Sequence, residues 1–383
     1  MRLSVTVTNF FEISLNLASE LKCHWLFFLG IILILHNMNY LTANHRVAIL
    51  LHEGIKGTHG KTGLAYLRYG QASIVAVIDA ECAGESLKQL TGIPKHIPIV
   101  SSVQAALTCD PDVLLIGIAP SGGILPDAWK EEIKQGIIAG LSVVNGLHTP
   151  LAPNFPNLNP QQWIWDIRQE PSGLSIGKAK ARSLVCQRIL TVGTDMSVGK
   201  MSTSLECHNA AQKRGIKSKF LGTGQGGIMI SGGGIALDAI RVDFAAGAVE
   251  KMVLEAGNDY DVLWIEGQGS LCHPGSTATL PLIRGSQPTD LILVHRAGQT
   301  HINRLPDVAI PPLKQVIELY ESVASVAGTT DEIKVKAIAL NTFHLDELDA
   351  KKAIETVQET TGLPCTDVVR FGADKLLDFL LNN

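Results

Sequence analysis

The sequence predicts an α/β protein built from two doubly wound parallel sheets, one after the other along the chain. Short runs of apolar, β-branched residues alternate with helical stretches over most of the 383 residues, which is the pattern of repeated β-α-β units. Glycine occurs 36 times, as expected where many tight turns join strands to helices. A chain of this length is expected to form two domains.

Composition narrows the functional classes. Hydrophobic residues make up 46% and charged residues 18% of the chain, which is enough to bury two cores and too apolar for a disordered protein. The formal net charge of −4 gives no reason to expect nucleic acid or an anionic membrane surface as a partner. The seven cysteines include no C-x-x-C pair, so we expect free thiols, a cytoplasmic location and no zinc site.

Residues 1–37 differ from the rest of the chain. Residues 25–35 form an uncharged apolar run that is shorter than the about 20 residues needed to span a membrane, and no small-residue cleavage site follows it. Met38 precedes the first clear strand. We therefore interpret residues 1–37 as an artefactual or disordered upstream extension; a membrane anchor and a signal sequence are the alternatives.

Residues 38–153 are predicted to form a Rossmann-like domain. Apolar runs predict buried parallel strands at residues 47–51, 73–78, 112–118 and 141–144. Helical patterns lie between them at residues 61–69, 101–108 and 127–139. Because β-α-β crossovers are right-handed, this succession winds helices over both faces of one sheet.

A second candidate anion site lies at the start of the first helix of this domain. Gly54 is followed by five residues and then by Gly60, Lys61 and Thr62, a string similar to a phosphate loop. The functional interpretation is an anion or CoA-like contact at the helix N-terminus; the alternative is an ordinary turn before a helix. The stretch lacks the G-x-G-x-x-G fingerprint of dinucleotide-binding domains.

Residues 154–183 are predicted to be a linker, because Pro and Asn are frequent from residue 150 to residue 160 and favour irregular structure. Asp166 and Arg168 lie two positions apart in this segment. Such a pair is usually solvated; the alternative is a latch between the two domains.

Residues 184–383 are predicted to form a doubly wound parallel sheet of the P-loop NTPase type. An apolar strand leads into a loop bounded by Gly193 and Gly199, after which Lys200 begins a helical pattern. Glycines let the backbone wrap an anion, the helix N-terminus is positive, and the lysine reaches the outer phosphates. The predicted phosphate-binding residues are Gly193, Thr194, Asp195, Met196, Ser197, Val198, Gly199, Lys200, Met201 and Ser202.

Two features of this loop depart from the common phosphate loop. Five residues, one more than usual, separate the first glycine from the Gly-Lys pair,. Met201 follows the lysine, where a magnesium-binding Ser or Thr is the usual residue. The alternative to a phosphate site is an ordinary glycine-rich turn between a strand and a helix.

Two further loops are predicted to carry substrate contacts. Residues 222–234 are rich in glycine and show little periodicity, so we predict a substrate loop containing Gln225 and no packed element. A buried strand at residues 261–265 ends at Glu266, and an acid at this place is the partner that a phosphate loop needs for its metal. Glu266 is therefore expected to face Lys200. The residues that would let the backbone approach a substrate are Gly267, Gln268, Gly269 and Ser270.

The remaining pattern completes the second sheet. Strands are predicted at residues 218–221, 291–294, 335–340 and 367–371, and helices at residues 201–211, 242–256, 312–327, 345–361 and 373–381. Asn341 ends one strand, where it could read a nucleotide base or form a turn. His273 is either a general base or a loop histidine.

The phosphate loop also resembles a known one. Gly193-Thr194-Asp195 with Val198-Gly199-Lys200 is similar to the G-T-D-x-x-V-G-K loop of dethiobiotin synthetase and its relatives, in which the longer spacing is normal. The Met-Ser after the lysine is similar to a narrower group, once catalogued as a domain of unknown function and now associated with D-glutamate N-acetyltransferase. Further motifs agree with that group: Asp166-Ile167-Arg168, Gly222-Thr223-Gly224-Gln225, Asp243-Phe244 and Ile265-Glu266-Gly267-Gln268-Gly269-Ser270.

The resemblance implies an N-acyltransferase of D-amino acid metabolism that moves an acetyl group from acetyl-CoA to D-glutamate or a similar amino acid. The loop would hold the CoA phosphates. The proton of the attacking ammonium would be taken by Glu266, Asp243 or His273. Met201 in the usual magnesium position favours CoA over ATP.

Two other classes remain open on sequence grounds. One is an ATP-dependent and Mg²⁺-dependent ligase or carboxylase of the dethiobiotin synthetase type, with Glu266 and Ser202 as metal ligands. The other is a nucleotide-sensing regulator without chemistry. For the enzyme classes we expect a small-molecule amino acid substrate, no membrane partner and a homo-oligomer.

Overall fold

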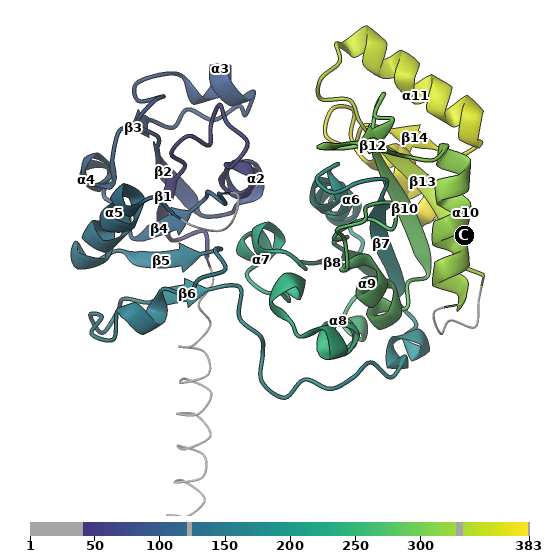
Figure 1. Cartoon of the computed structure of the whole chain (residues 1–383), viewed down its shortest axis with the longest axis horizontal. Helices are drawn as coiled ribbons and strands as arrows, with labels where there is room; N and C mark the ends of the chain where they lie inside the picture. Colours follow the sequence, from purple (N-terminus) through teal and green to yellow (C-terminus); the bar gives the residue numbers. More distant parts are fainter. Residues whose placement is uncertain (1–40, 121–124, 327–331, 382–383) are drawn as a thin grey trace, which may run out of the picture. The chain divides into compact units, whose positions relative to one another are not determined.

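The structure, a computed structural model, describes residues 41–120, 125–326 and 332–381 (Figure 1). The extension predicted for residues 1–37 lies outside these ranges. Within them, none of the helices combines the length and the apolar character needed to cross a membrane.

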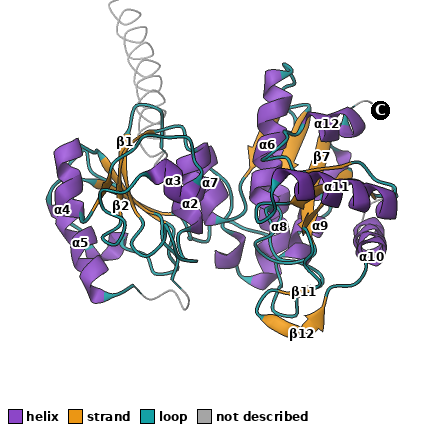
Figure 2. Cartoon of the chain, turned by 90° about the horizontal axis from the view of Figure 1, so that it is seen from above, coloured by secondary structure: helices purple, strands orange, loops and turns teal. Residues whose placement is uncertain are grey.

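The first sheet is entirely parallel and has the strand order β3-β2-β1-β4-β5-β6. This is the order of the Rossmann fold, so the predicted Rossmann-like domain is confirmed. Helices α2 and α3 lie on one face of the sheet, and α4 and α5 lie on the other (Figure 2). The strands are β1 (Arg46–Leu50), β2 (Ser73–Ile78), β3 (Ile99–Val100), β4 (Val113–Ile116), β5 (Ser142–Asn145) and β6 (Ile164–Asp166), and the helices are α2 (Lys61–Tyr69), α3 (Leu87–Thr91), α4 (Val103–Ala106) and α5 (Asp127–Ile138).

The second sheet is also parallel, with the order β14-β13-β10-β7-β9-β8. Its strands are β7 (Gln187–Gly193), β8 (Ser218–Leu221), β9 (Val262–Ile265), β10 (Asp290–Arg296), β13 (Lys334–Asn341) and β14 (Cys365–Thr366). Its helices are α6 (Lys200–Lys213), α8 (Val242–Gly257), α9 (Thr279–Ser286), α10 (Leu313–Val326), α11 (Glu347–Thr361) and α12 (Asp374–Leu380). A hairpin of β11 (His301–Ile302) and β12 (Leu305–Ala309) follows β10.

The strands of the second sheet are apolar on both faces because helices cover both. Successive side chains of a strand point to opposite faces. Ile189 accordingly packs in the core formed with α6 and α12, whereas Leu190 packs in the core formed with α8, α9 and α10. β7 lies in the middle of the sheet, between β9 and β10, so the ends of these three strands meet at one edge.

Three sequence predictions about secondary structure are wrong. Residues 154–183 are not simply a linker, because β6 within them pairs with β5 at the edge of the first sheet. Residues 367–371 are not a strand: the carboxylate of Asp367 accepts N–H groups of Thr342, Val369 and Arg370, which closes a turn after β14. Polar side chains that bond to the nearby backbone in this way compete with strand pairing.

The glycine-rich segment at residues 222–234 is also not an irregular loop, because it contains helix α7 (Gln225–Ser231). Ile228 and Met229 are 4% and 0% exposed and belong to the core of the first sheet. A Cβ atom on Gly146, after β5, would lie 2.6 Å from the Met229 methyl carbon. A helix that follows a strand of the second sheet therefore completes the core of the first.

Met229→Ala should lower the free energy of unfolding by about 2–5 kcal/mol, the usual cost of emptying a buried site. Urea denaturation measures it. Leu348→Ala is the control, because Leu348 is 78% exposed and its truncation should change stability by less than about 0.5 kcal/mol. Equal effects of the two substitutions would contradict the packing of α7 in the first core.

Candidate functional site

The loop from β7 to α6 has the backbone of an anion cradle. Gly199 adopts φ 119° as it turns the chain into α6, a conformation that residues other than glycine avoid. Ser197 has φ 58°, which is uncommon for a residue with a side chain. Lys200 is the first residue of α6, is 6% exposed, and donates from Nζ to the Asp195 carbonyl at 2.8 Å. The predicted phosphate loop therefore has its lysine folded back over the loop.

Hydrogen bonds to Gln299, Asn303 and Tyr320, which lie outside the loop, hold it in place. The Asp195 carboxylate accepts Met196 N–H at 2.6 Å, the Gln299 side-chain amide at 2.6 Å and Asn303 N–H at 2.7 Å. The Tyr320 hydroxyl of α10 donates to the Gly193 carbonyl at 2.8 Å. Since Asp195 uses its charge on these donors, its role is to shape the loop and to fix the β11–β12 hairpin beside it.

Asn341 joins the same framework at the end of β13. Its side-chain amide donates to the Val198 carbonyl at 2.9 Å and accepts Phe343 N–H at 3.1 Å. Asn341 thus forms a turn, one of the two interpretations of the sequence, and also supports the phosphate loop.

Glu266 follows β9 and is only 3% exposed. One carboxylate oxygen accepts Thr223 N–H at 2.8 Å and Gly224 N–H at 3.1 Å, and the other accepts the side-chain amide of Gln268 at 3.1 Å. A Cβ atom on Gly227 would lie 2.2 Å from the carboxylate, so α7 can pack here only with glycine at that place.

Glu266 and Lys200 are both buried and act on each other electrostatically, and their pKa values approach each other. Burial raises the pKa of Glu266 to about 7, against the lowering effects of two backbone N–H groups and of Lys200. Burial likewise lowers the pKa of Lys200 to about 8, against the opposite effects of Asp195 and Glu266. A carboxylate with a pKa near 7 is suited to exchange protons with a substrate at neutral pH.

The segment after Glu266 approaches the phosphate loop closely. A Cβ atom on Gly267 would lie 1.7 Å from the Thr191 carbonyl oxygen of β7, and one on Gly269 would lie 2.0 Å from Ser276 Oγ. Ser270 N–H donates to Ser276 Oγ at 2.9 Å. The glycines predicted for a substrate contact thus also allow close packing between the two strand ends.

Glu266 and Ser202, the residues predicted as magnesium ligands if Mg-ATP is used, lie in different surroundings. Met201 lies against α7, since a Cβ atom on Gly226 would lie 3.2 Å from its sulfur. Ser202, the next residue, points in a direction about 100° further round the helix. It lines a cavity beside the phosphate loop. No hydrogen bond joins Ser202 to Glu266 in the described part of the chain, and no group of three His, Cys, Asp or Glu side chains there could hold a metal ion. Met201 therefore supplies no oxygen ligand at the place where a phosphate loop usually has a Ser or Thr for magnesium.

A cavity of about 380 Å³ adjoins the phosphate loop at the ends of β10 and β13. Its walls include Val198 and Gly199 of the loop, Asn341, Val368 and Arg370. This mixture of apolar walls and a few polar groups is typical of a ligand pocket. Because it begins at the loop, one ligand with a ring system and phosphates could occupy both.

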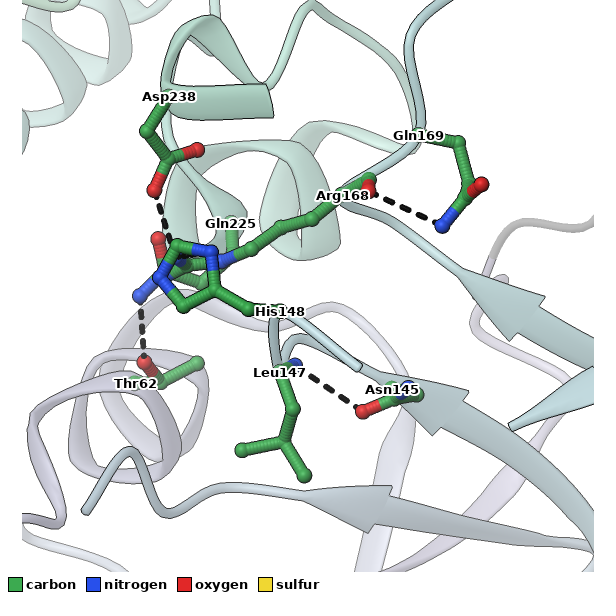
Figure 3. Close-up of polar contacts among 8 residues, drawn as sticks. All are labelled: Thr62, Asn145, Leu147, His148, Arg168, Gln169, Gln225 and Asp238. Atoms are coloured by element: carbon green, nitrogen blue, oxygen red, sulfur yellow. Dashed lines mark hydrogen bonds and ion pairs between the residues drawn. The ribbon is translucent and has the colours of Figure 1, made fainter. Parts of the chain in front are cut away.

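The second candidate anion site lies against the phosphate loop. Lys61, the first residue of α2, donates from Nζ to Ser197 Oγ at 2.9 Å. Thr62 Oγ1 accepts the side-chain amide of Gln225 at 3.3 Å (Figure 3). A Cβ atom on Gly60 would lie 2.3 Å from the Gly54 carbonyl oxygen, so packing explains that glycine. The structure thus brings Lys61 to the predicted phosphate site.

Arg168 forms a latch and does not pair with Asp166. Its guanidinium donates to Asp238 at 2.6 Å and contacts the ring of His148 (Figure 3). Asp166 instead accepts Asn145 Nδ2 at 2.7 Å and the N–H groups of Leu151 and Ala152. The latch joins the end of the first sheet to the segment after α7. Asp238 also raises the pKa of Glu266, so this cluster influences the site.

Asp243 and His273, the other two predicted bases, lie in surroundings that differ from those of Glu266. Asp243 is exposed in the first turn of α8 and acts electrostatically on Arg241. His273 Nδ1 accepts Gly275 N–H at 3.0 Å, so the neutral ring carries its proton on Nε2 and has no free acceptor nitrogen. The geometry favours Glu266 over both.

Sequence reasoning missed several residues that shape the site: His148, Arg296, Gln299, Asn303 and Tyr320. These residues are far from their partners in the sequence, and the fold brings them together. Among them, only His148 gave a local signal, as a polar residue beside a proline-rich connection.

Comparisons with known proteins match both halves of the chain to one family. A Rossmann-like domain described as DUF1611_N, a domain of unknown function, matches residues 80–170. A P-loop domain described as DUF1611_C matches residues 175–377. The crystal structure of a DUF1611 family protein from Anabaena variabilis is 64% identical, with a TM-score of 0.86, and covers 89% of this chain and 100% of that chain.

Two curated relatives are named D-glutamate N-acetyltransferase. The relative from a Pseudoalteromonas species is 37% identical over 270 residues, which are 69% of this chain and 79% of the relative. The relative from Tritonibacter scottomollicae is 37% identical over 285 residues, 73% of this chain and 84% of the relative. The family resemblance drawn from the loop motifs is confirmed.

Lys200→Ala should weaken the binding of a phosphate ligand by about 2–4 kcal/mol, because a buried charge-assisted contact is lost. Isothermal titration calorimetry with acetyl-CoA and with ATP measures the effect. Lys213→Ala, at the other end of α6, removes the same charge away from the loop and should leave both affinities unchanged. Unchanged affinity in Lys200→Ala would reject the phosphate-loop assignment.

Glu266→Gln should change how stability depends on pH. The raised pKa means that the folded protein holds this proton more tightly than the unfolded chain does. The free energy of unfolding should therefore fall by roughly 3 kcal/mol as pH rises from about 4.5 to about 7. Glutamine cannot ionise, so the variant should lack this fall.

Urea denaturation between pH 5 and pH 8 checks this expectation. Glu359→Gln, which removes an exposed carboxylate on α11, is the control and should keep the wild-type slope. A Glu266→Gln profile parallel to the wild type would show that Glu266 is not held protonated by its surroundings.

Proposed function

This chain belongs to the DUF1611 family, and we propose that it transfers an acetyl group from acetyl-CoA to the amine of D-glutamate or a similar amino acid. The names of two relatives at 37% identity support acetyl transfer. The observation that carries the proposal is the buried Glu266 carboxylate beside the phosphate loop, with its pKa raised to about 7.

The proposed reaction begins with proton removal. The ammonium group of the acceptor gives one proton to the Glu266 carboxylate, which leaves a nitrogen lone pair. That lone pair attacks the thioester carbonyl carbon, so that a C–N bond forms and the C–S bond breaks. Glu266 returns its proton to the leaving thiolate, and the second proton of the nitrogen passes to water.

Binding and chemistry would be divided between two parts of the site. The phosphate loop with Lys200 would hold the phosphates of acetyl-CoA, and the adjoining cavity of about 380 Å³ would accept its adenine,. Thr223 and Gly224 fix the carboxylate of Glu266 through their N–H groups, which orients it as a base. ATP shares the adenine and the phosphates, but Met201 offers no oxygen to the magnesium that an ATP-dependent ligase needs.

Glu266→Gln should lower kcat for acetyl transfer by about 10²–10⁴, the usual loss for a missing general base, with acetyl-CoA affinity nearly unchanged. Wild-type activity should persist in EDTA. Met201→Thr should be neutral or harmful, because it removes the contact with Gly226 and there is no metal to gain. A thiol-release assay with a panel of D- and L-amino acids measures these effects.

The alternatives give different results in the same assay. Activity that disappears in EDTA and returns with Mg-ATP, or that improves in Met201→Thr, would overturn the proposal in favour of the ligase. Ligand binding without turnover of any amino acid would favour the regulator.

A further inference from the structure

Two cations form hydrogen bonds with Ser197 of the phosphate loop, and a third lies near one of them. Lys61 donates from Nζ to Ser197 Oγ at 2.9 Å. Arg296 donates from a terminal nitrogen to the Ser197 carbonyl at 3.4 Å. Arg304 is close enough to act electrostatically on Lys61, as Arg296 also is. These residues are called the rim cations below.

The rim cations come from three separate elements that are fixed to the loop. Lys61 begins α2, Arg296 ends β10, and Arg304 lies in the turn between β11 and β12. The neighbouring N–H of Asn303 donates to the Asp195 carboxylate at 2.7 Å, which holds this turn beside the loop. Their convergence is therefore built into the fold.

The positive charge of the rim is not balanced within the described residues. None of the rim cations forms a salt bridge in residues 41–120, 125–326 and 332–381. Asp195 acts on Lys61, but its carboxylate already accepts three hydrogen bonds. Burial lowers the pKa of Lys61, and repulsion from Arg296 and Arg304 lowers it further. Like charges held together in this way cost free energy that a bound anion would recover.

We propose that Lys61, Arg296 and Arg304 form a second anion subsite, which binds a phosphate or carboxylate group lying beyond the phosphates held by the loop and Lys200. Arginine matches both groups with paired N–H donors, and lysine adds a point charge. The identity of this anion rests on the proposed function. The anion is then either the 3′-phosphate of CoA or a carboxylate of an acidic acceptor.

The first arm of the test is calorimetry on Lys61→Gln, Arg296→Gln and Arg304→Gln, with Lys213→Gln as the control. Each rim variant should bind acetyl-CoA about 10-fold more weakly if its 3′-phosphate is the ligand, the value of one charge-assisted contact. Acetyl-3′-dephospho-CoA should then bind wild type and rim variants equally. The control should match the wild type with both ligands.

The second arm is steady-state kinetics with D-glutamate and D-glutamine, which differ in one carboxylate. If the rim binds the acceptor, the rim variants should raise KM for D-glutamate about 10-fold and leave acetyl-CoA affinity unchanged. KM for D-glutamine should change little. Wild-type affinity and wild-type KM in all three rim variants would overturn the subsite.

A third probe separates this inference from the proposed function. Inorganic tripolyphosphate can reach from the loop to the rim and needs no transfer activity to be measured. If no amino acid is acetylated, weaker tripolyphosphate binding in the rim variants still supports the subsite, whereas equal binding rejects it.

Discussion

The buried carboxylate of Glu266 is the constraint on which the rest of the site depends. An ionised group without water is costly unless hydrogen bonds and an opposite charge stabilise it. Glu266 has two backbone N–H donors, from Thr223 and Gly224, and the influence of Lys200. These partners come from the ends of β8 and β7, so the order β7-β9-β8 in the sheet is what brings them together.

The same requirement explains why α7 is rich in glycine. Gly227 must lack a side chain because a Cβ atom there would lie 2.2 Å from the Glu266 carboxylate, and Gly226 packs against Met201. The other end of α7 places Met229 in the core of the first sheet. One short helix thus connects the stability of the first core with the position of the Glu266 carboxylate, and the Arg168–Asp238 contact reinforces this connection.

The parts of the molecule that could be predicted from sequence are those specified locally. The phosphate loop was predicted because strand, glycines, lysine and helix are contiguous between Gly193 and Lys200, and Glu266 because an acid ends a clear apolar strand. The helix α7 could not be predicted, since its glycines are required by contacts with distant residues and look like flexibility in the sequence. The contact of Lys61 with Ser197 joins residues 136 positions apart, and no local pattern specifies such a pair. The Gly60-Lys61-Thr62 motif did indicate an anion, although not that it would lie at the first loop.

Met201 shows how a departure from a motif can carry information about chemistry. A P-loop that binds Mg-ATP keeps a hydroxyl after the lysine because the metal needs a hard oxygen ligand. Here that place is used for packing against Gly226, and Ser202, one residue on, lines the neighbouring cavity. The cations of the site are instead protein side chains, Lys200 inside the loop and Lys61 and Arg296 on Ser197 outside it. Protein cations can neutralise phosphates, and under the proposed function Glu266 acts as the base that exchanges a proton with the substrate.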